Sequence, residues 1–440
     1  FVIPPYIFLL LYGNTKTAKS QAWTSIFVMR LTKTVKYVTI FENKNTEEGA
    51  VNAKEIHETI IVGGGASGML CAVALARAGC GRVLLLERNE RLGRKLSATG
   101  NGQGNVTNED LSVSHYFSDD LSAVSSVLSA FGREELLSFL RLSGGLFGAD
   151  ERGRVYPASR QASSVTDILR FELARRGVGV RTGVRVRAVK KTDGIFEAET
   201  DSGIFCGKRL VLACGGKAAP HLGTEGDGYL FARSFGHTVT TLRPSLVQLR
   251  TETKEIRGLK GVRSCCALTL KRGDKKLCAF SGDVLFTDYG VSGDAVFRAS
   301  AFAEAGDILY IDFLPEFSEK EVADLLYSKN AAQSDTGAED LLRCVVNSAI
   351  GRAILRAAGI SPAVSGADLR KAIPRIVRGC KRTALAVTGS AGFDSAQVTK
   401  GGVPLSELNS DLMSKKVRGL YLAGELVNVC LLYTSPSPRD

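Results

Sequence analysis

The sequence predicts an α/β protein in which a nucleotide-binding domain of βαβ type is interrupted by a mostly antiparallel β-barrel domain and a small helical insert. Three observations support this prediction. A strand, a glycine-rich turn, a helix and a second strand follow one another over residues 59–87. Alternating strands then run between residues 245 and 313, and a last strand at 419–423 comes after a stretch of helical patterns. At 440 residues the chain is long enough for two or three domains.

The βαβ unit has the glycine spacing of a dinucleotide site. Gly63, Gly65 and Gly68 stand at G-x-G-x-x-G spacing between an apolar strand and an alanine-rich helix at residues 69–78. Gly63 permits the tight turn, Gly65 lets the backbone touch a pyrophosphate, and Gly68 lets the helix approach the strand closely. The N–H groups at the start of the helix attract the anion. The unit is therefore predicted to be the core of a Rossmann-like domain.

An acidic residue at the end of the second strand narrows the choice of nucleotide. Glu87 lies nineteen residues after Gly68, where a carboxylate accepts hydrogen bonds from an adenosine ribose and repels a 2′-phosphate. FAD or NAD is therefore favoured over NADP. A nicotinamide dehydrogenase would continue from Glu87 into further βα repeats, whereas this strand leads directly into RLGRKLSATGNGQGNVTN.

This glycine-rich loop predicts a long ligand that lies against the backbone. Its basic pair would neutralise phosphate charge, its glycines would let the chain run flat along an extended molecule, and its asparagines would supply amide donors and acceptors. These residues are Arg94 and Lys95; Gly100, Gly102 and Gly104; and Asn101 and Asn105. A long ligand that itself lines the reaction site fits FAD better than NAD.

The order of the motifs resembles one flavoprotein family. VGGGASG, the acid after the second strand and GRKLSATGNGQGNVTN look like the BaiN-like family of FAD-dependent oxidoreductases, also called YhiN-like or aminoacetone-oxidase-like flavoproteins. The resemblance covers about residues 60–429 and continues through GRVYPASRQASSVTDIL, LVLACGGKAAPHLGTEGDGYL, FSGDVLFTDYGVSGDAV and QVTKGGVPLSELNSDLMSKKVRGLYLAGEL. The family loop usually reads GNGRCN, and Gln103 and Gly104 here replace its Arg and Cys. The roles of those two side chains are therefore not carried over.

The resemblance implies further approaches of the backbone to the cofactor. A strand near the middle of the chain passes the adenine, a second glycine pair follows a buried strand, and a Gly-Glu pair closes over the ribitol and phosphates. The predicted cofactor-binding residues are Gly63, Gly65, Ala66, Ser67, Gly68, Glu87, Arg88, Arg94, Lys95, Thr99, Gly100, Asn101, Gly102, Asn105, Val186, Ala213, Gly215, Gly216, Gly424 and Glu425.

The predicted domain boundaries follow these motifs. Residues 54–220 form the first part of a discontinuous FAD-binding domain, 221–315 a barrel-like substrate domain, 316–378 the helical insert, 379–395 a return through the barrel, and 396–429 the second part of the FAD-binding domain. Residues 1–53 lack clean periodicity and 430–440 break off the pattern abruptly. Both segments are expected to be foreign to the folded protein, and the chain is expected to be truncated at its C-terminal end.

Two patterns predict the detail of the inserted part. The basic run RGLKGVRSCCALTLKRGDKK at residues 257–276 alternates and contains a KRGDKK turn, so it predicts a solvated hairpin rather than a polyanion site. Helical patterns at 318–327, 339–350 and 367–373 predict the helices of the insert.

The resemblance implies an FAD-dependent oxidoreductase that transfers a hydride between flavin and a small organic or steroid-like molecule. No second G-x-G-x-x-G follows, so NAD(P)H is expected only as a transient co-substrate, and no nucleic acid is expected as a partner. Two alternatives stay open. A flavin-dependent tRNA-modifying enzyme is consistent with the net charge of +12, and a truncated chain unable to hold FAD would be inactive.

The cysteines, the histidines and the apolar run at the start of the chain bear on metal, catalytic and membrane sites. The ten cysteines are scattered without a CxxC pair, which predicts reduced thiols in a cytoplasmic protein and no metal site. No catalytic side chain stands out, His237 is expected to cap or pack at a helix end, and the sequence does not indicate an oligomeric state. The apolar run at the start is about a dozen residues long, below the roughly 18 that cross a bilayer, so no membrane association is expected.

Overall fold

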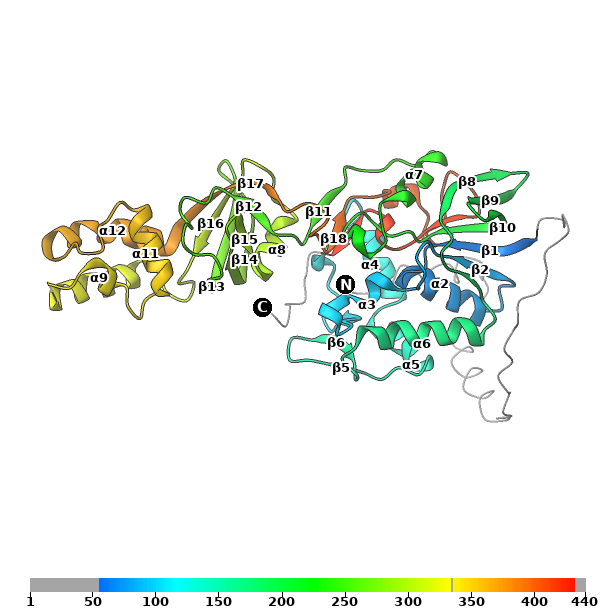
Figure 1. The fold of residues 1–440 in the computed structure, drawn as a ribbon, viewed down its shortest axis with the longest axis horizontal. Coiled ribbons are helices and arrows are strands. Elements are labelled where there is room, and N and C mark those ends of the chain that lie inside the picture. The colour runs from blue at the N-terminus through cyan, green and yellow to red at the C-terminus, as the bar shows by residue number, and fades with distance from the viewer. Residues whose placement is uncertain (1–54, 334, 432–440) are drawn as a thin grey trace.

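The computed structural model describes residues 55–333 and 335–431. The nucleotide-binding domain lies at one end of an elongated molecule, the barrel lies in the middle, and the helical insert lies at the other end (Figure 1). This arrangement confirms the predicted fold class, a Rossmann-like α/β domain with an inserted antiparallel barrel and a small helical part.

The nucleotide-binding domain is built on a parallel sheet extended by an antiparallel meander. Its parallel strands are β7 (Gly179–Arg181), β2 (Val83–Leu86), β1 (Ile56–Val62), β10 (Gly203–Leu212) and β19 (Leu420–Leu422), and β8 (Val186–Thr192) and β9 (Ile195–Thr200) complete the meander with β10. All four residues of β2 are buried, because a parallel strand is covered on both faces. The predicted first strand thus begins three residues earlier than the apolar run at 59–62, at Ile56.

Alternate residues of the central strands pack into two different cores. Ile61 and Leu85 belong to the core under α2 (Ala66–Arg77) and α6 (Ala162–Arg175), while Ile60 and Leu84 belong to the core on the opposite face. That second core includes Tyr229 of α7 (Asp227–Ser234). Both faces of the sheet are covered, and this fixes the ends of β1, β2 and β10 relative to one another.

Smaller elements complete this domain. They are α3 (Arg94–Ser97), β3 (Thr107–Asn108), β4 (Tyr116–Ser118), α4 (Leu121–Ala130), α5 (Arg133–Leu142), β5 (Phe147–Ala149), β6 (Arg154–Pro157), β11 (Arg243–Ser245), β18 (Val398–Lys400) and β20 (Val429–Leu431), with 3₁₀ turns η3 (Thr99–Gly102), η4 (Val113–His115), η5 (Pro220–Leu222), η6 (Leu405–Glu407) and η7 (Gly424–Leu426). β20 pairs with β4, so a strand continues two residues into the segment expected to be foreign.

The inserted barrel is closed by six strands. Its order is β12 (Leu249–Thr251), β15 (Gly290–Ser292), β14 (Lys275–Phe286), β13 (Arg263–Arg272), β16 (Ile308–Asp312) and β17 (Thr383–Ser390), with α8 (Asp294–Ser300) packed against β14. Arg272 pairs with Lys275 across a two-residue turn of Gly273 and Asp274. The predicted KRGDKK hairpin is therefore confirmed.

The helical insert departs from its prediction at two places. Its helices are α9 (Glu319–Ala332), α10 (Ala338–Leu341), α11 (Ser348–Ala357) and α12 (Gly366–Arg382). The single helix predicted at 339–350 is wrong, because Cys344 has a φ of +59° and the Asn347 side chain caps a new helix.

The prediction that the last helix ends at residue 373 is also wrong. Pro374 stands inside α12 and removes one backbone hydrogen bond, at a cost of about 3 kcal/mol. The helix continues because its buried side, which includes Ile373, Ile376 and Val377, packs in the barrel and insert core on both sides of the proline.

His237 joins two parts of the nucleotide-binding domain, and its side chain is completely buried. It follows α7, its Nδ1 lies 2.6 Å from a Glu407 carboxylate oxygen, and its Nε2 lies 2.8 Å from the Ser414 hydroxyl. Its packing at a helix end agrees with the sequence prediction. Burial opposes ionisation of Glu407, but hydrogen bonds from Thr238, Lys416 and His237 lower its pKa to about 2.

The Glu407 carboxylate is expected to make the stability of the fold sensitive to acid. The lowered pKa of Glu407 contributes stability above its usual value of 4.5, and that contribution is lost as the pH falls toward about 2. Urea unfolding of wild type and Glu407→Gln across pH 7 to 3 should show a smaller loss of stability on acidification in the variant. Equal pH dependence in both proteins would contradict this assignment.

Candidate functional site

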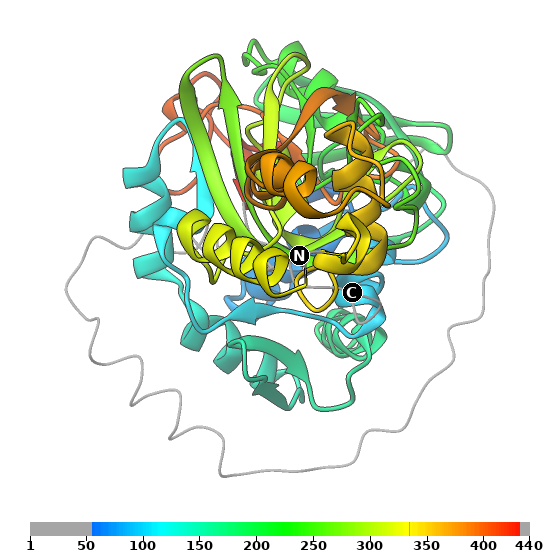
Figure 2. The ribbon, with the colours of Figure 1, turned by 90° about the vertical axis from the view of Figure 1, so that its left-hand side faces the viewer.

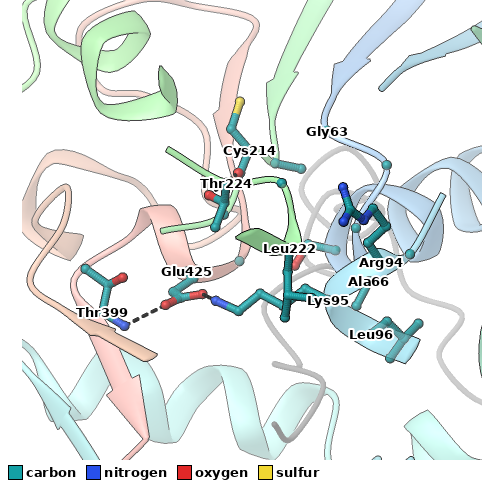
Figure 3. Close-up of a pocket in the computed structure, with 18 of the residues that line it drawn as sticks. Gly63, Ala66, Arg94, Lys95, Leu96, Cys214, Leu222, Thr224, Thr399 and Glu425 are labelled. Carbon is teal, nitrogen blue, oxygen red and sulfur yellow. Dashed lines mark hydrogen bonds and ion pairs between the residues drawn. The ribbon is translucent and has the colours of Figure 1, made fainter. Parts of the chain in front are cut away.

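A cavity of about 1130 Å³, partly open to solvent, lies at the carboxyl ends of the central strands. It is bounded by the start of α2, the short helix α3 and the turn η7, which come from distant parts of the sequence (Figure 3). Twelve predicted cofactor residues line it: Gly63, Gly65, Ala66, Ser67, Glu87, Arg94, Lys95, Thr99, Ala213, Gly215, Gly424 and Glu425. Ligands bind at this edge in open α/β sheets.

The three glycines of the fingerprint have different local roles. A Cβ on Gly68 would lie 1.8 Å from the carbonyl oxygen of Gly63, and a Cβ on Gly63 would lie 2.4 Å from that of Ala213. Both glycines therefore allow backbone contacts within the protein. Gly65 differs, because its Cβ would meet nothing within 4 Å.

The start of α2 leaves an anion site open to the cavity. Gly65 occupies the N-cap position, and no side chain caps the helix. The first N–H groups of a helix have no partner within the helix, and the helix dipole places partial positive charge there. The residues present thus fit a diphosphate group, because the backbone at Gly65 has room for a close approach.

Glu87 is held in place by hydrogen bonds within the protein. One carboxylate oxygen accepts a hydrogen bond of 2.7 Å from the Gly64 backbone N–H, and the other accepts bonds of 2.8 and 2.6 Å from the backbone and side chain of Asn89. The side chain is buried at the end of β2. This geometry orients a carboxylate toward the cavity at the position expected for the ribose.

An ion pair connects the two separate parts of the domain across the cavity. The ammonium group of Lys95 on α3 lies 2.8 Å from one carboxylate oxygen of Glu425 in η7, and the other oxygen accepts a hydrogen bond of 2.6 Å from the Thr399 backbone (Figure 3). Gly424 makes the approach possible, since a Cβ there would lie 2.3 Å from the Ser67 hydroxyl. The Gly-Glu pair and the βαβ unit therefore meet at one place.

A smaller neighbouring cavity continues the site. It is lined by Val186 and Arg88, as well as by Gly63 and Glu87, which it shares with the main cavity. Arg88 forms ion pairs of 2.7 Å with Glu225 and 3.4 Å with Asp227. The structure therefore places Val186 and Arg88 beside the expected ribose end, where the sequence reasoning put the adenine.

Six predicted residues do not line either of these cavities. They are Gly68, Gly100, Asn101, Gly102, Asn105 and Gly216. The segment after Thr99 coils into a 3₁₀ turn with positive φ at Gly100, Asn101 and Gly102 instead of running flat. Gly100 lies close to Asn105 and Tyr156, since a Cβ there would lie 3.0 Å from the Asn105 backbone nitrogen and 3.3 Å from the Tyr156 ring. Contact of these residues with a cofactor stays a prediction.

The sequence analysis also missed lining residues. Cys214, Asn89, Leu222, Thr224, Val398 and Thr399 contribute to the cavity. Thr224 and Thr399 lie within motifs that were recognised, GTEGDG and QVTKGG, but a threonine alone gives no signal of which way it faces. Burial raises the pKa of the Cys214 thiol to about 12, so this thiol is protonated at neutral pH and is a poor nucleophile.

The Rossmann-type sheet and this cavity agree with a sequence-family comparison. The family model described as HI0933-like protein Rossmann domain matches residues 57–431. The chain belongs to the HI0933-like family. This membership, together with the reductase relative below, confirms the predicted BaiN-like family and its class of enzyme, an FAD-dependent oxidoreductase.

Relatives of this family member cover most of its length. It is 37% identical over 380 residues to the 3-dehydro-bile acid delta(4,6)-reductase of Clostridium scindens, covering 84% of this chain and 92% of that protein. It is 28% identical over 380 residues to the ribosomal RNA dihydrouridine synthase of Escherichia coli, covering 85% of this chain and 92% of that protein. The corresponding enzyme of Haemophilus influenzae is also 28% identical.

Solved structures with a similar arrangement are more distant. The 3-ketosteroid-delta4-(5alpha)-dehydrogenase of Rhodococcus jostii is 16% identical, with a TM-score of 0.46 and coverage of 88% of this chain and 94% of that chain. A flavocytochrome c3 fumarate reductase is 16% identical, with a TM-score of 0.42 and coverage of 85% and 73%.

Two further observations concern the described part of the family member. None of its helices is both long and apolar enough to cross a membrane. All ten cysteines fall within residues 55–333 and 335–431, and each is a free thiol.

The open space beside Gly65 predicts that a larger side chain there prevents FAD binding without destabilising the fold. Gly65→Val should abolish FAD retention, because its side chain would fill the space beside the first N–H groups of α2. The free energy of unfolding of the flavin-free protein should change by about 1 kcal/mol or less, since nothing in the protein lies near that Cβ. Gly68→Ala is the control that should lower stability instead. A Gly65→Val protein that remains fully yellow would contradict the site.

The ion pair across the cavity predicts that a change at Lys95 weakens FAD binding. Lys95→Met should weaken FAD binding by about 10- to 100-fold, because it removes a cation near the phosphates and leaves the mostly buried Glu425 carboxylate without its partner. Lys95→Arg should keep most of the affinity, since it preserves the charge. Titration of flavin-free protein with FAD, followed by flavin fluorescence, measures the difference. Wild-type affinity in Lys95→Met would remove Lys95 from the cofactor site.

Proposed function

We propose that this chain uses bound FAD to reduce a carbon–carbon double bond conjugated to a carbonyl group in a small, steroid-like molecule. The observation that carries this proposal is the 37% identity to a bile acid reductase over 92% of that enzyme's length. The cavity supports it, because an open helix start, a fixed carboxylate and a cation lie at the positions that a dinucleotide needs.

The reactions for which the relatives are named are of one type. A delta(4,6)-reductase of a 3-dehydro-bile acid saturates double bonds conjugated to a ketone, and a dihydrouridine synthase saturates the double bond of uracil next to its carbonyl. In such a reduction a hydride adds to the carbon distant from the carbonyl, and a proton adds to the neighbouring carbon. The hydride brings both electrons and one hydrogen and the proton brings the second hydrogen, so the double bond becomes a single bond with two electrons and two protons taken up.

The residues of the cavity would hold the cofactor by its diphosphate and its adenosine ribose. The backbone N–H groups that follow Gly65 would bind the diphosphate, Glu87 would accept hydrogen bonds from the ribose, and Lys95 would neutralise phosphate charge. FAD, when bound and reduced, would supply the hydride from its isoalloxazine ring. The protein's part is to position the two molecules and to exclude water.

We also propose NAD(P)H as the electron donor. The chain has a single G-x-G-x-x-G fingerprint, at Gly63 to Gly68, and the cavity beside it is the FAD site of this proposal. A nicotinamide would therefore bind transiently. The location proposed for the protein is the cytoplasm, because ten free thiols suit a reducing compartment.

A second candidate function has a specific observation in its favour. Two ribosomal RNA dihydrouridine synthases are 28% identical over 380 residues, so an RNA base is the alternative substrate to a small molecule. The sequence predicts no nucleic-acid partner, whereas these two relatives favour RNA as a partner. The lower identity places this candidate after the steroid-like substrate.

One experiment distinguishes these candidates. The purified chain is reduced without oxygen by NADH or NADPH, and its absorbance near the visible flavin band is followed as a substrate is added. We expect reoxidation by a 3-oxo steroid with a conjugated double bond and none by the matching saturated ketone. Reoxidation by uridine-containing RNA alone would favour the second candidate. A protein that binds FAD but is reoxidised by neither substrate would contradict both candidates.

A further inference from the structure

The helical insert carries a basic surface that the proposed reaction does not use. We define the basic ridge as Arg370, Lys371, Arg375, Arg378 and Arg382 of α12 together with Lys271, Lys275 and Lys276 of the β13–β14 hairpin. α12 contains six basic residues and one acidic residue, Asp368. Lys381 is the basic residue of α12 that turns inward, toward Asp312 at 2.8 Å. Figure 2 looks onto this end of the molecule, with α12 in front of the barrel.

The two parts of the ridge meet at one aromatic side chain. Tyr310 on β16 lies under both Arg382, at 4.7 Å from the ring centroid, and Lys271, at 5.8 Å. Arg370 lies in the same way over Tyr327 of α9, at 5.4 Å. Stacking on a ring holds a guanidinium group in a defined position, which lowers the entropy lost when it binds an anion.

Most of the ridge has no acidic partner within the described residues. Lys371 lies 3.1 Å from Asp368, and Arg375 donates a hydrogen bond of 3.0 Å to the Ala358 carbonyl. In residues 55–333 and 335–431, no carboxylate forms an ion pair with Arg370, Arg378 or Arg382, nor with the three hairpin lysines. Elsewhere exposed cations are often paired, as with Arg187 and Asp201 at 2.7 Å.

The ridge also places like charges next to one another. Lys271 lies directly opposite Lys276 in the hairpin ladder, and on α12 the pairs Lys371/Arg375 and Arg378/Arg382 are each four residues apart. Such pairs of like charge destabilise a hairpin or a helix. Basic residues in the last turn of α12 favour the helix dipole, but this does not account for Arg370, Lys371 or the hairpin. A bound polyanion would relieve the repulsion.

We propose that the basic ridge binds the phosphate backbone of RNA, which reverses the expectation from the sequence that the hairpin lysines are a solvated surface rather than a polyanion site. Four of its residues are arginines, whose fork of N–H donors suits phosphate oxygens. Within the described residues, α12 and the β13–β14 hairpin themselves expose no large hydrophobic side chain that could enter a lipid surface. Phe317 and Leu325 are exposed just before and on α9, which packs against α12, so vesicles are included in the test.

The α12 part of the ridge lies at the end of the barrel away from the cavity (Figure 1). The hairpin lies at the other end, where its Arg272 and Arg243 of β11 both form ion pairs with Glu304. RNA bound along the ridge would therefore extend from the insert toward the nucleotide-binding domain.

The test measures RNA binding by the full chain. Fluorescence anisotropy of a short fluorescein-labelled oligoribonucleotide is followed at several salt concentrations for wild type and for R370E/R378E. The control is R152E/R418E, which makes the same change in net charge at exposed positions away from the ridge. We expect R370E/R378E to lower affinity by at least about tenfold and to make the slope of log K against log salt shallower by about 1.4, while the control changes both much less.

Each other outcome overturns the proposal. These are absence of RNA binding by wild type, equal loss in the control, or unchanged binding by R370E/R378E when circular dichroism shows that it is folded. The same variants are tested on vesicles of phosphatidylglycerol and phosphatidylcholine, and a defect confined to vesicles would assign the ridge to membranes instead. Steroid-dependent reoxidation of flavin is measured in parallel. Loss of RNA binding would then test the basic ridge, and absence of reoxidation would test the proposed reaction, so the two results are distinguishable.

Discussion

The candidate site depends on the close contact between the start of α2 and the end of β1. The backbone of Gly68 approaches the Gly63 carbonyl so closely that a Cβ would lie 1.8 Å from it. This contact directs the uncapped N–H groups of α2 into the space above the sheet, where Gly65 leaves the backbone accessible. Without it, the partial positive charge of the helix start would not face the cavity.

The second constraint is that the cavity needs both parts of an interrupted domain. The barrel and the insert separate the βαβ unit from β19, yet β19 pairs with β10 in the same sheet. The turn after β19 then brings Glu425 to Lys95, and Thr399 of β18 fixes the same carboxylate. A charge pair at the junction thus links cofactor binding to correct assembly of segments more than three hundred residues apart.

The two candidate substrates differ in whether they need the basic ridge. A small enone needs contact with the cavity alone, whereas an RNA substrate needs a surface that holds phosphates away from the reacting base. The insert extends from the barrel and carries such a surface, with arginines positioned on tyrosine rings. Reduction of a double bond beside a carbonyl is common to both substrates, so the cavity can have the same role in either case.

The sequence by itself determined the βαβ unit, the hairpin and the alternating strands of the barrel, because glycine spacing and apolar periodicity are local consequences of backbone geometry. It also indicated Gly65, Glu87 and Lys95, whose types and spacing match a dinucleotide, and Glu425 through the family resemblance. Only the tertiary structure decided that Gly100 to Gly102 coil away from the cavity and that Thr399 faces it. It also decided that α12 continues past Pro374, since burial against the barrel offsets a local cost. Local patterns specify conformation over one or two turns, whereas the direction of a side chain toward a cavity depends on packing between distant segments.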